Sequence, residues 1–180
     1  MSARRTNVIL IGFMGTGKSS VGRAIASRMG FQFIDTDALV VEHARMDIAD
    51  IFAKEGEARF RDMETAAIES VGHFTRCVIA TGGGAVLREQ NRTLLRKLGF
   101  VVCLTASEAT IFERVARNQK RPLLHTENPR ETVSRMLAER ATFYEQTAEL
   151  ILDTTTFSHQ QAADAVIAGA RRAFSWDAAT

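Results

Sequence analysis

The octapeptide Gly12–Ser19, GFMGTGKS, constrains the fold most strongly because it matches the phosphate-binding pattern G-x-x-x-x-G-K-[ST]. It follows the apolar run Val8–Ile11 and precedes a segment with Val21, Ile25 and Met29 at helical spacing. A strand, a glycine-rich turn and a helix N-terminus in this order form an anion site, because backbone N–H groups and the helix dipole favour phosphate. In such a loop the lysine reaches the β- and γ-phosphates, and the final hydroxyl can bind Mg²⁺. The pattern therefore predicts nucleoside triphosphate binding by Gly12, Gly15, Thr16, Gly17, Lys18, Ser19 and Ser20.

Length and composition favour one globular domain over residues 1–180, since 46% of the 180 residues are hydrophobic and can form a full core. The 23 Lys and Arg against 21 Asp and Glu are scattered along the chain, which argues against a nucleic-acid groove. We find no apolar stretch of membrane-spanning length and no signal-peptide core in the start MSARRTN. These features lead us to expect a cytoplasmic protein with no membrane partner.

Short apolar runs alternate with helix-like segments along the chain. We predict an α/β fold with a parallel sheet, whose strands lie near 8–11, 33–35, 78–80, 101–104 and 150–152. Cys77 and Cys103 fall inside two of these runs and are predicted to be core residues rather than ligands or a disulfide. The polar segment Arg117–Pro129 has no helix or strand signal, and long loops of this kind are often active-site lids.

Two missing sequence elements restrict the kinds of nucleotide-binding enzyme that this chain can be. The sequence has no Asn-Lys-x-Asp element for reading guanine, and the strand before Gly82 ends in threonine rather than in the aspartate that usually serves Mg²⁺. The alternative carboxylates are Asp35 and Asp37 in FIDTD, which would share a face if the extended conformation continued through Thr36. Ligands of open α/β sheets bind at this carboxyl end. Asp37 could equally be the N-cap of a following helix, and position alone leaves both interpretations open.

Other candidates are individually weak. Arg61 can pair with Glu57 at i, i+4 and with Glu64 at i, i+3, which by itself favours a solvated helix face. Gly82–Gly84 is either an ordinary turn or a place where a ligand approaches the backbone closely. Further basic and aromatic candidates surround the predicted lid: Arg114, Arg117, Lys120, Arg121, Arg140 and Tyr144.

Taken together, these motifs resemble those of the shikimate kinases over nearly the whole chain. The matching pieces, in order, are GFMGTGKSSVG, FIDTD, IFAKEGEARFRDMET, ATGGGAV, RPLL and LAERATFYEQTA. The resemblance implies a three-layer αβα P-loop fold of the nucleoside monophosphate kinase type, with a five-stranded parallel sheet. It also implies a mobile lid at about 114–129, a shikimate-binding helical region at about 36–64, and a monomer. The implied reaction is ATP-dependent phosphorylation of the shikimate 3-hydroxyl, giving shikimate 3-phosphate and ADP, in aromatic amino-acid (chorismate) biosynthesis.

The resemblance also implies roles for single residues. Lys18 and Ser19 correspond to the phosphate and Mg²⁺ ligands, and Asp35 to a carboxylate that holds the metal through water. Asp37 corresponds to the general base, and Arg121 to the lid arginine at the transferred phosphoryl group. Arg61 and Arg140 correspond to the clamp on the shikimate carboxylate, with Gly82, Gly83 and Gly84 beside it. Arg114 and Thr154 correspond to the adenine site.

The chain departs from the family pattern at two places. Arg45 stands where a glycine is usual, and the tail from Phe174 to Thr180 has no counterpart, so we expect a frayed end. Two other functions remain open at this level. A kinase for another polyol acid such as gluconate would share the phosphate loop without the two clamp arginines. A ligand-sensing domain of a transcription regulator would need an added DNA-binding segment, for which the strand at Val8 leaves no room.

Overall fold

The computed structural model describes residues 6–116 and 128–174. Its centre is one five-stranded parallel sheet in the order β2-β3-β1-β4-β5, which confirms the predicted α/β class. The strands are β1 (Asn7–Ile11), β2 (Gln32–Asp35), β3 (Cys77–Ala80), β4 (Gly99–Thr105) and β5 (Leu150–Asp153). Every predicted strand is present, and each one is one to three residues longer than predicted.

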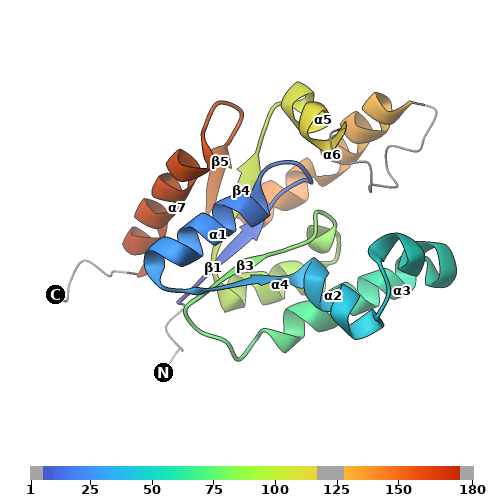
Figure 1. The fold of residues 1–180 in the computed structure, drawn as a ribbon, viewed down its shortest axis with the longest axis horizontal. Coiled ribbons are helices and arrows are strands. Elements are labelled where there is room, and N and C mark those ends of the chain that lie inside the picture. The colour runs from blue at the N-terminus through green and yellow to red at the C-terminus, as the bar shows by residue number, and fades with distance from the viewer. Residues whose placement is uncertain (1–5, 117–127, 175–180) are drawn as a thin grey trace.

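Helices cover both faces of the sheet, as Figure 1 shows. They are α1 (Lys18–Met29), α2 (Thr36–Ala44), α3 (Ile48–Ser70), the 3₁₀ turn η1 (Ala85–Leu87), α4 (Glu89–Leu98), α5 (Glu108–Ala116), α6 (Pro129–Thr147) and α7 (His159–Phe174). None of the helices within the described ranges is long and apolar enough to cross a bilayer.

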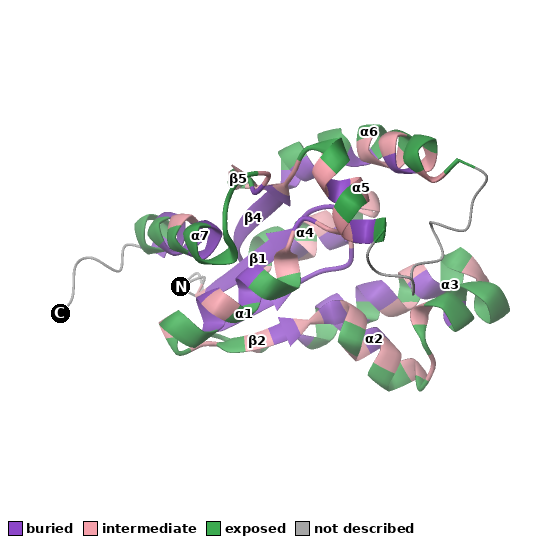
Figure 2. Cartoon of the chain, turned by 45° about the horizontal axis from the view of Figure 1, so that its top comes forward, coloured by how far each residue is buried: buried purple, intermediate pink, exposed green. Residues whose placement is uncertain are grey.

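Side-chain alternation along β1 builds a core on each face of the sheet. Val8 and Leu10 pack with residues of α1 and α7. Ile9 and Ile11 point to the opposite face and pack with residues of α3, α4 and α6. All four are completely buried, as expected for a parallel strand covered on both sides (Figure 2). Cys77 and Cys103 are buried free thiols in these cores, as predicted.

Helices α2 and α3 lie side by side and have a small core of their own, built on Val40, Ile51, Phe60 and Ala67 (Figure 1). Helix α3 is broken at Gly56, whose φ of 83° and ψ of 169° are accessible essentially only to glycine. The predicted helical region at 36–64 therefore consists of α2, the first part of α3, and the start of its second part.

Two expectations at the ends of elements need correction, and a third element end explains a departure from the family pattern. Phe174 is not part of a frayed tail: it is the last residue of α7 and packs edge-on against Phe100, with ring centroids 6.2 Å apart. Pro129 is not in a loop but begins α6 after the N-cap Asn128, since proline fits the first helical turn. Arg45 ends α2 in the left-handed conformation, with φ 51° and ψ 36°, which explains why glycine suits this position.

Candidate functional site

The phosphate loop joins the carboxyl end of β1 to the N-terminus of α1, as its sequence predicts. Gly17 precedes the helix in a left-handed conformation. The Lys18 ammonium lies inside the loop and donates hydrogen bonds to the carbonyls of Gly12 at 2.7 Å and Phe13 at 2.8 Å. The Thr16 hydroxyl is buried and donates to the same Phe13 carbonyl at 2.8 Å. The loop therefore holds a cation within a frame of backbone groups at a helix N-terminus, which suits phosphate.

Asp35 and Asp37 lie next to this loop, at the carboxyl end of β2. The Ser19 hydroxyl donates to Asp35 Oδ2 at 3.1 Å, and Asp35 Oδ1 accepts from the Asp37 backbone N–H at 3.1 Å. Asp35, not Asp37, is therefore the N-cap of α2, which overturns the alternative interpretation of Asp37. The extended conformation also ends at Asp35, because Thr36 is already helical.

Several predicted site residues lie next to the three glycines after β3. A methyl group on Gly82 would lie 2.5 Å from Asp37 Oδ1 and 2.7 Å from Glu64 Oε1. On Gly83 it would lie 3.5 Å from Arg140 Nη1 and 3.6 Å from the Gly12 carbonyl. On Gly84 it would clash with the guanidinium of Arg61. Side chains from three separate helices thus press against one bare backbone segment, so this is a close-approach site and not an ordinary turn.

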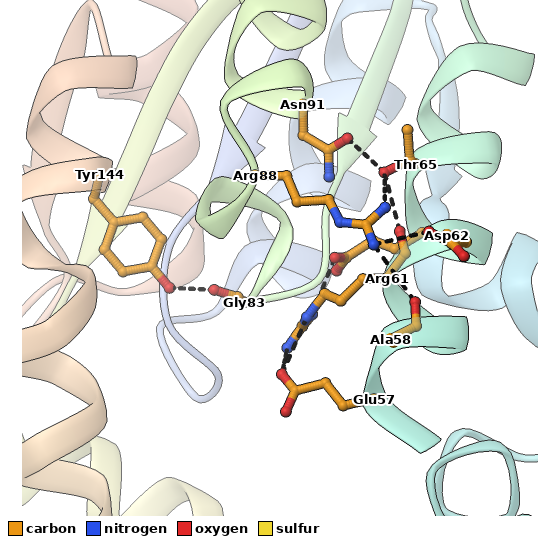
Figure 3. Close-up of polar contacts among 10 residues, drawn as sticks. Glu57, Ala58, Arg61, Asp62, Thr65, Gly83, Arg88, Asn91 and Tyr144 are labelled. Atoms are coloured by element: carbon orange, nitrogen blue, oxygen red, sulfur yellow. Dashed lines mark hydrogen bonds and ion pairs between the residues drawn. The ribbon is translucent and has the colours of Figure 1, made fainter. Parts of the chain in front are cut away.

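Arg61 lies between two carboxylates on α3. Its Nη2 is 3.0 Å from Glu57 Oε1 and its Nη1 is 3.0 Å from Glu64 Oε2, so both predicted pairs form. Figure 3 shows its guanidinium directed along the helix toward Glu57. The Arg61 side chain is only 12% exposed, which excludes the solvated face that the sequence favoured on its own.

Glu64 is a site residue that sequence reasoning named only as a partner of Arg61. Its side chain is 1% exposed, and Oε1 has no hydrogen-bond partner among the described residues. Burial raises the pKa of Glu64 above its ordinary value; Arg61 partly offsets this, and nearby Asp37 raises it further. The i, i+3 spacing from Arg61 was the available signal, but it did not reveal that this helix face packs on Gly82.

Arg140 and Tyr144 reach the same glycines from α6. Arg140 is buried and places its guanidinium carbon 5.5 Å from the centre of the Phe13 ring in the phosphate loop. The Tyr144 hydroxyl donates to the Gly83 carbonyl at 2.6 Å (Figure 3). Burial raises the Tyr144 pKa well above its ordinary value, so the phenol stays a proton donor. The two arginines of the predicted clamp thus lie against neighbouring glycines, Arg140 at Gly83 and Arg61 at Gly84.

Arg114 and Thr154 come together on the other side of the phosphate loop. Arg114 donates to the Gly15 carbonyl at 3.2 Å and to the Thr154 carbonyl at 3.1 Å. The buried Thr154 hydroxyl is within hydrogen-bond distance of the Thr16 and Thr105 carbonyls, at 3.0 and 2.9 Å. Its side chain is therefore directed at the protein backbone, and Arg114 links the loop to the segment after β5.

Three basic residues that the sequence analysis named around the predicted lid lie outside the described residues: Arg117, Lys120 and Arg121.

A cavity of about 510 Å³ is lined in part by Thr6, Phe31 and Arg76, which precede β1, β2 and β3. It is therefore at the amino ends of the strands, opposite the site described above, and none of the predicted site residues lines it.

Comparisons with known proteins agree with this geometry. A family model described as shikimate kinase matches residues 14–170. The chain is 45% identical over 161 residues to the shikimate kinase of Thermodesulfovibrio yellowstonii, covering 89% of this chain and 92% of the relative. It is 52% identical over 149 residues to that of Geobacter metallireducens, covering 83% of each.

Solved structures of kinases are also similar to this chain. A shikimate kinase from Acinetobacter baumannii in complex with shikimate matches with a TM-score of 0.89 and 32% identity, covering 97% of this chain and 96% of that one. A gluconokinase from Sinorhizobium meliloti 1021 matches with a TM-score of 0.61 and 21% identity, covering 98% and 99% of the two chains. The second match reflects a shared fold alone.

Proposed function

The chain belongs to the shikimate kinase family, and from this premise we propose how its residues carry out the reaction. It transfers the γ-phosphoryl group of ATP to the 3-hydroxyl of shikimate, producing shikimate 3-phosphate and ADP, a step of aromatic amino-acid biosynthesis. The observation that supports the residue roles best is the convergence on Gly82–Gly84 of the phosphate loop, a carboxylate and two arginines.

Arg61 and Arg140 bind the shikimate carboxylate in this proposal. A guanidinium presents parallel N–H donors that match a carboxylate, and the two side chains flank the same glycine segment from α3 and α6. The bare backbone of Gly82, Gly83 and Gly84 lets these side chains come close to the segment, since a methyl group on Gly82 or Gly84 would clash with them. A kinase that acts on gluconate would not require this pair of arginines, so their presence beside the glycine segment favours shikimate as the acceptor.

Asp37 accepts the proton of the attacking hydroxyl. Its carboxylate lies at Gly82, in the same glycine segment that contacts the phosphate loop at Gly83 and Arg61 at Gly84, so we assign the attacking hydroxyl to this place. Phosphoryl transfer offers the protein little covalent chemistry, and positioned positive charge does most of the catalysis. Lys18 supplies such charge from the loop, and we assign the same role to Arg121 from its motif RPLL.

Ser19 and Asp35 are the residues that would hold Mg²⁺. A hydroxyl and a carboxylate 3.1 Å apart next to the phosphate loop form the hard oxygen set that this ion prefers, and Mg²⁺ usually keeps water and phosphate oxygens as its other ligands. When bound with ATP, the ion neutralises charge on the β- and γ-phosphates. Asp35 would act through water, since its other oxygen caps α2.

The nucleotide base is proposed to lie at Arg114 and near Thr154, beyond the Gly15 end of the loop. We propose that residues 1–180 form one domain, with 36–64 as the acceptor-binding region and 114–129 as a lid that excludes water from the transferred group. A monomeric state and a cytoplasmic location stay predictions, for which light scattering and cell fractionation are the direct measurements.

A coupled assay of ADP formation tests the function. We expect turnover with shikimate that greatly exceeds turnover with quinate, gluconate or no acceptor, because closure around the acceptor completes the site. ADP formation at the same rate without shikimate would overturn the proposal, and faster turnover of gluconate would replace it with the other kinase.

A further inference from the structure

Arg88 joins the substrate-binding helix to the glycine segment, although it lies outside the proposed site. It stands between η1 and α4, four residues after Gly84. Its Nη2 is 2.8 Å from Asp62 Oδ1 and 3.5 Å from the Ala58 carbonyl, and its Nη1 donates to Thr65 Oγ1 at 3.3 Å. One guanidinium therefore contacts three successive turns on one face of α3, as Figure 3 shows.

These three contacts surround Arg61. Ala58 precedes Arg61 by three residues, Asp62 follows it directly, and Thr65 lies one turn later. The Thr65 hydroxyl is also 3.0 Å from the Arg61 carbonyl and 2.9 Å from Asn91 Oδ1 on α4 (Figure 3). Thr65 and Asn91 are buried, so this second link between α3 and α4 is protected from water.

The contacts form a closed ring through the site. The Arg61 guanidinium lies against the Gly84 backbone, and the chain then runs through the 3₁₀ turn, whose Ala85 and Val86 are completely buried. Arg88 follows and returns to α3 on both sides of Arg61. Every segment of this ring is short and held by contacts, so the position of Arg88 and the position of Arg61 against Gly84 are linked through the structure.

We propose that Arg88 is a positioning residue that sets the placement of Arg61 for the carboxylate of the acceptor. This inference rests on the proposed function, because it assigns Arg88 an effect on shikimate binding. Arg88 itself does not touch the substrate in this proposal. An ordinary ion pair with Asp62, which is 58% exposed, would affect stability slightly and substrate binding not at all.

The test compares Arg88→Met with Arg88→Lys and with a control, Arg59→Met. Arg59 lies on the same helix as Arg61 and pairs with Glu55 at 3.4 Å, but its side chain is 58% exposed. For Arg88→Met we expect the KM for shikimate to rise roughly 3- to 10-fold, the effect of one or two lost hydrogen bonds, with kcat within about twofold. The affinity for ADP should not change. Arg88→Lys should be intermediate, because an ammonium can keep Asp62 but cannot also reach Ala58 and Thr65.

A double-mutant cycle separates positioning from general stability. If Arg88 acts through Arg61, then Arg88→Met should raise KM much less in an Arg61→Lys background than in the wild type. Equal effects in both backgrounds would overturn the inference, as would an unchanged KM in Arg88→Met or a full recovery in Arg88→Lys. If Arg88→Met does not fold, Asp62→Ala removes the shortest contact alone and should raise the KM for shikimate in the same direction.

The two proposals fail in different ways. Wild-type protein without shikimate-dependent ADP formation would contradict the proposed function. Active wild type with unchanged Arg88 variants would contradict only the positioning role.

Discussion

Asp35 and Asp37 stand two residues apart but have different surroundings. Asp35 accepts from Ser19 through one oxygen and from the Asp37 backbone through the other, so it serves the helix and the loop together. The Asp37 carboxylate is half-buried and lies over Gly82. In the proposed mechanism the two carboxylates therefore have separate roles: Asp35 lies on the side of the proposed metal site, and Asp37 faces the acceptor.

The substitution Asp37→Asn tests the second of these roles. It should lower kcat by about 10²–10⁴-fold, the usual range for a general base, because an amide cannot accept the proton. The melting temperature should change little, since the N-cap of α2 is Asp35. Steady-state kinetics and a thermal melt are the measurements, and near-normal kcat would remove Asp37 from proton transfer.

Arg61→Lys tests the clamp. An ammonium keeps the positive charge but cannot offer two parallel N–H donors, so we expect the loss of one charge-assisted contact, roughly 1.5–3 kcal/mol or about 10- to 100-fold in affinity. The effect should be seen in the KM for shikimate, because the carboxylate is held alike in the ground and transition states. ATP affinity by calorimetry should barely move.

The matched control is Arg59→Lys on the same helix, whose pair with Glu55 is exposed. It should leave both constants unchanged. An unchanged KM for shikimate in Arg61→Lys would show that the burial of Arg61 serves only the structure of α3.

Among the elements, α3 consists of two parts that have different contacts and are joined by a break. Its second part carries Arg61 and Glu64 to the glycine segment, and its first part packs with α2 through Ile51. Gly56 joins the two parts at φ 83° and ψ 169°. The break sets the direction in which the second part leaves the first, and it lies one residue before Glu57.

Gly56→Ala should therefore affect both stability and binding. A methyl group at Gly56 has no atom within 4 Å, so any cost comes from the backbone, about 1–3 kcal/mol for this conformation. That corresponds to a fall in melting temperature of roughly 2–10 °C for a chain of this size. The KM for shikimate should rise as the second part of α3 turns.

Gly30→Ala provides the comparison. Gly30 also has a positive φ of 63° and open space around it, but it ends α1, far in sequence from the clamp. It should lower the melting temperature and leave KM unchanged. A Gly56→Ala protein with normal melting and normal KM would mean that α3 does not need its break.

The stability of the whole molecule should depend on the protonation of Glu64. Its folded-state pKa is raised from 4.5, mainly by burial, so the folded state holds this proton to higher pH than the unfolded state. The contribution of Glu64 to stability is therefore fully present below about pH 4.5 and is lost as the pH rises through the folded-state pKa. Glu64→Gln, which cannot ionise, should not show this loss.

Urea unfolding of both proteins at a series of pH values measures the effect. The free energy of unfolding of the wild type, minus that of Glu64→Gln, should decrease with rising pH above about 4.5. Subtraction removes the titration of all other groups that the two proteins share. A difference that instead increases with pH would mean that the attraction of Arg61 outweighs burial and that the pKa is lowered.

Much of the fold was predictable because its signals are local. Five apolar runs define the strands, and the loop sequence GFMGTGKS defines the first turn and helix. The order of the strands in the sheet depends on contacts between segments far apart in the chain, and the break in α3 is a backbone conformation at Gly56 that the sequence pattern did not indicate. The residue that caps α2 was left open, because both Asp35 and Asp37 are good N-cap residues and only the backbone conformation distinguishes them.

The residues of the candidate site could be named from the sequence, but their arrangement could not. The resemblance to the shikimate kinases implied roles for Asp37, Arg61 and Arg140, yet it could not show that Arg61 is buried or that Glu64 lies beside Asp37. Burial depends on which helix face meets Gly82–Gly84, a contact between α3 and the end of β3. Arg88 carried no motif, and its three contacts with α3 follow only from the packing of α4.

The position of β1 in the sheet has a consequence for protein synthesis. β1 pairs only with β3 and β4, and β2 pairs only with β3, so Val8 first meets a partner at Val78, which is 70 residues later. At about 5–20 residues per second, translation leaves β1 without a neighbouring strand for roughly 3.5–14 s. During this interval the nascent chain already contains the complete phosphate-loop sequence but no sheet to hold it. A ribosome-bound fragment that ends before β3 should therefore depend on chaperones and be unable to retain nucleotide.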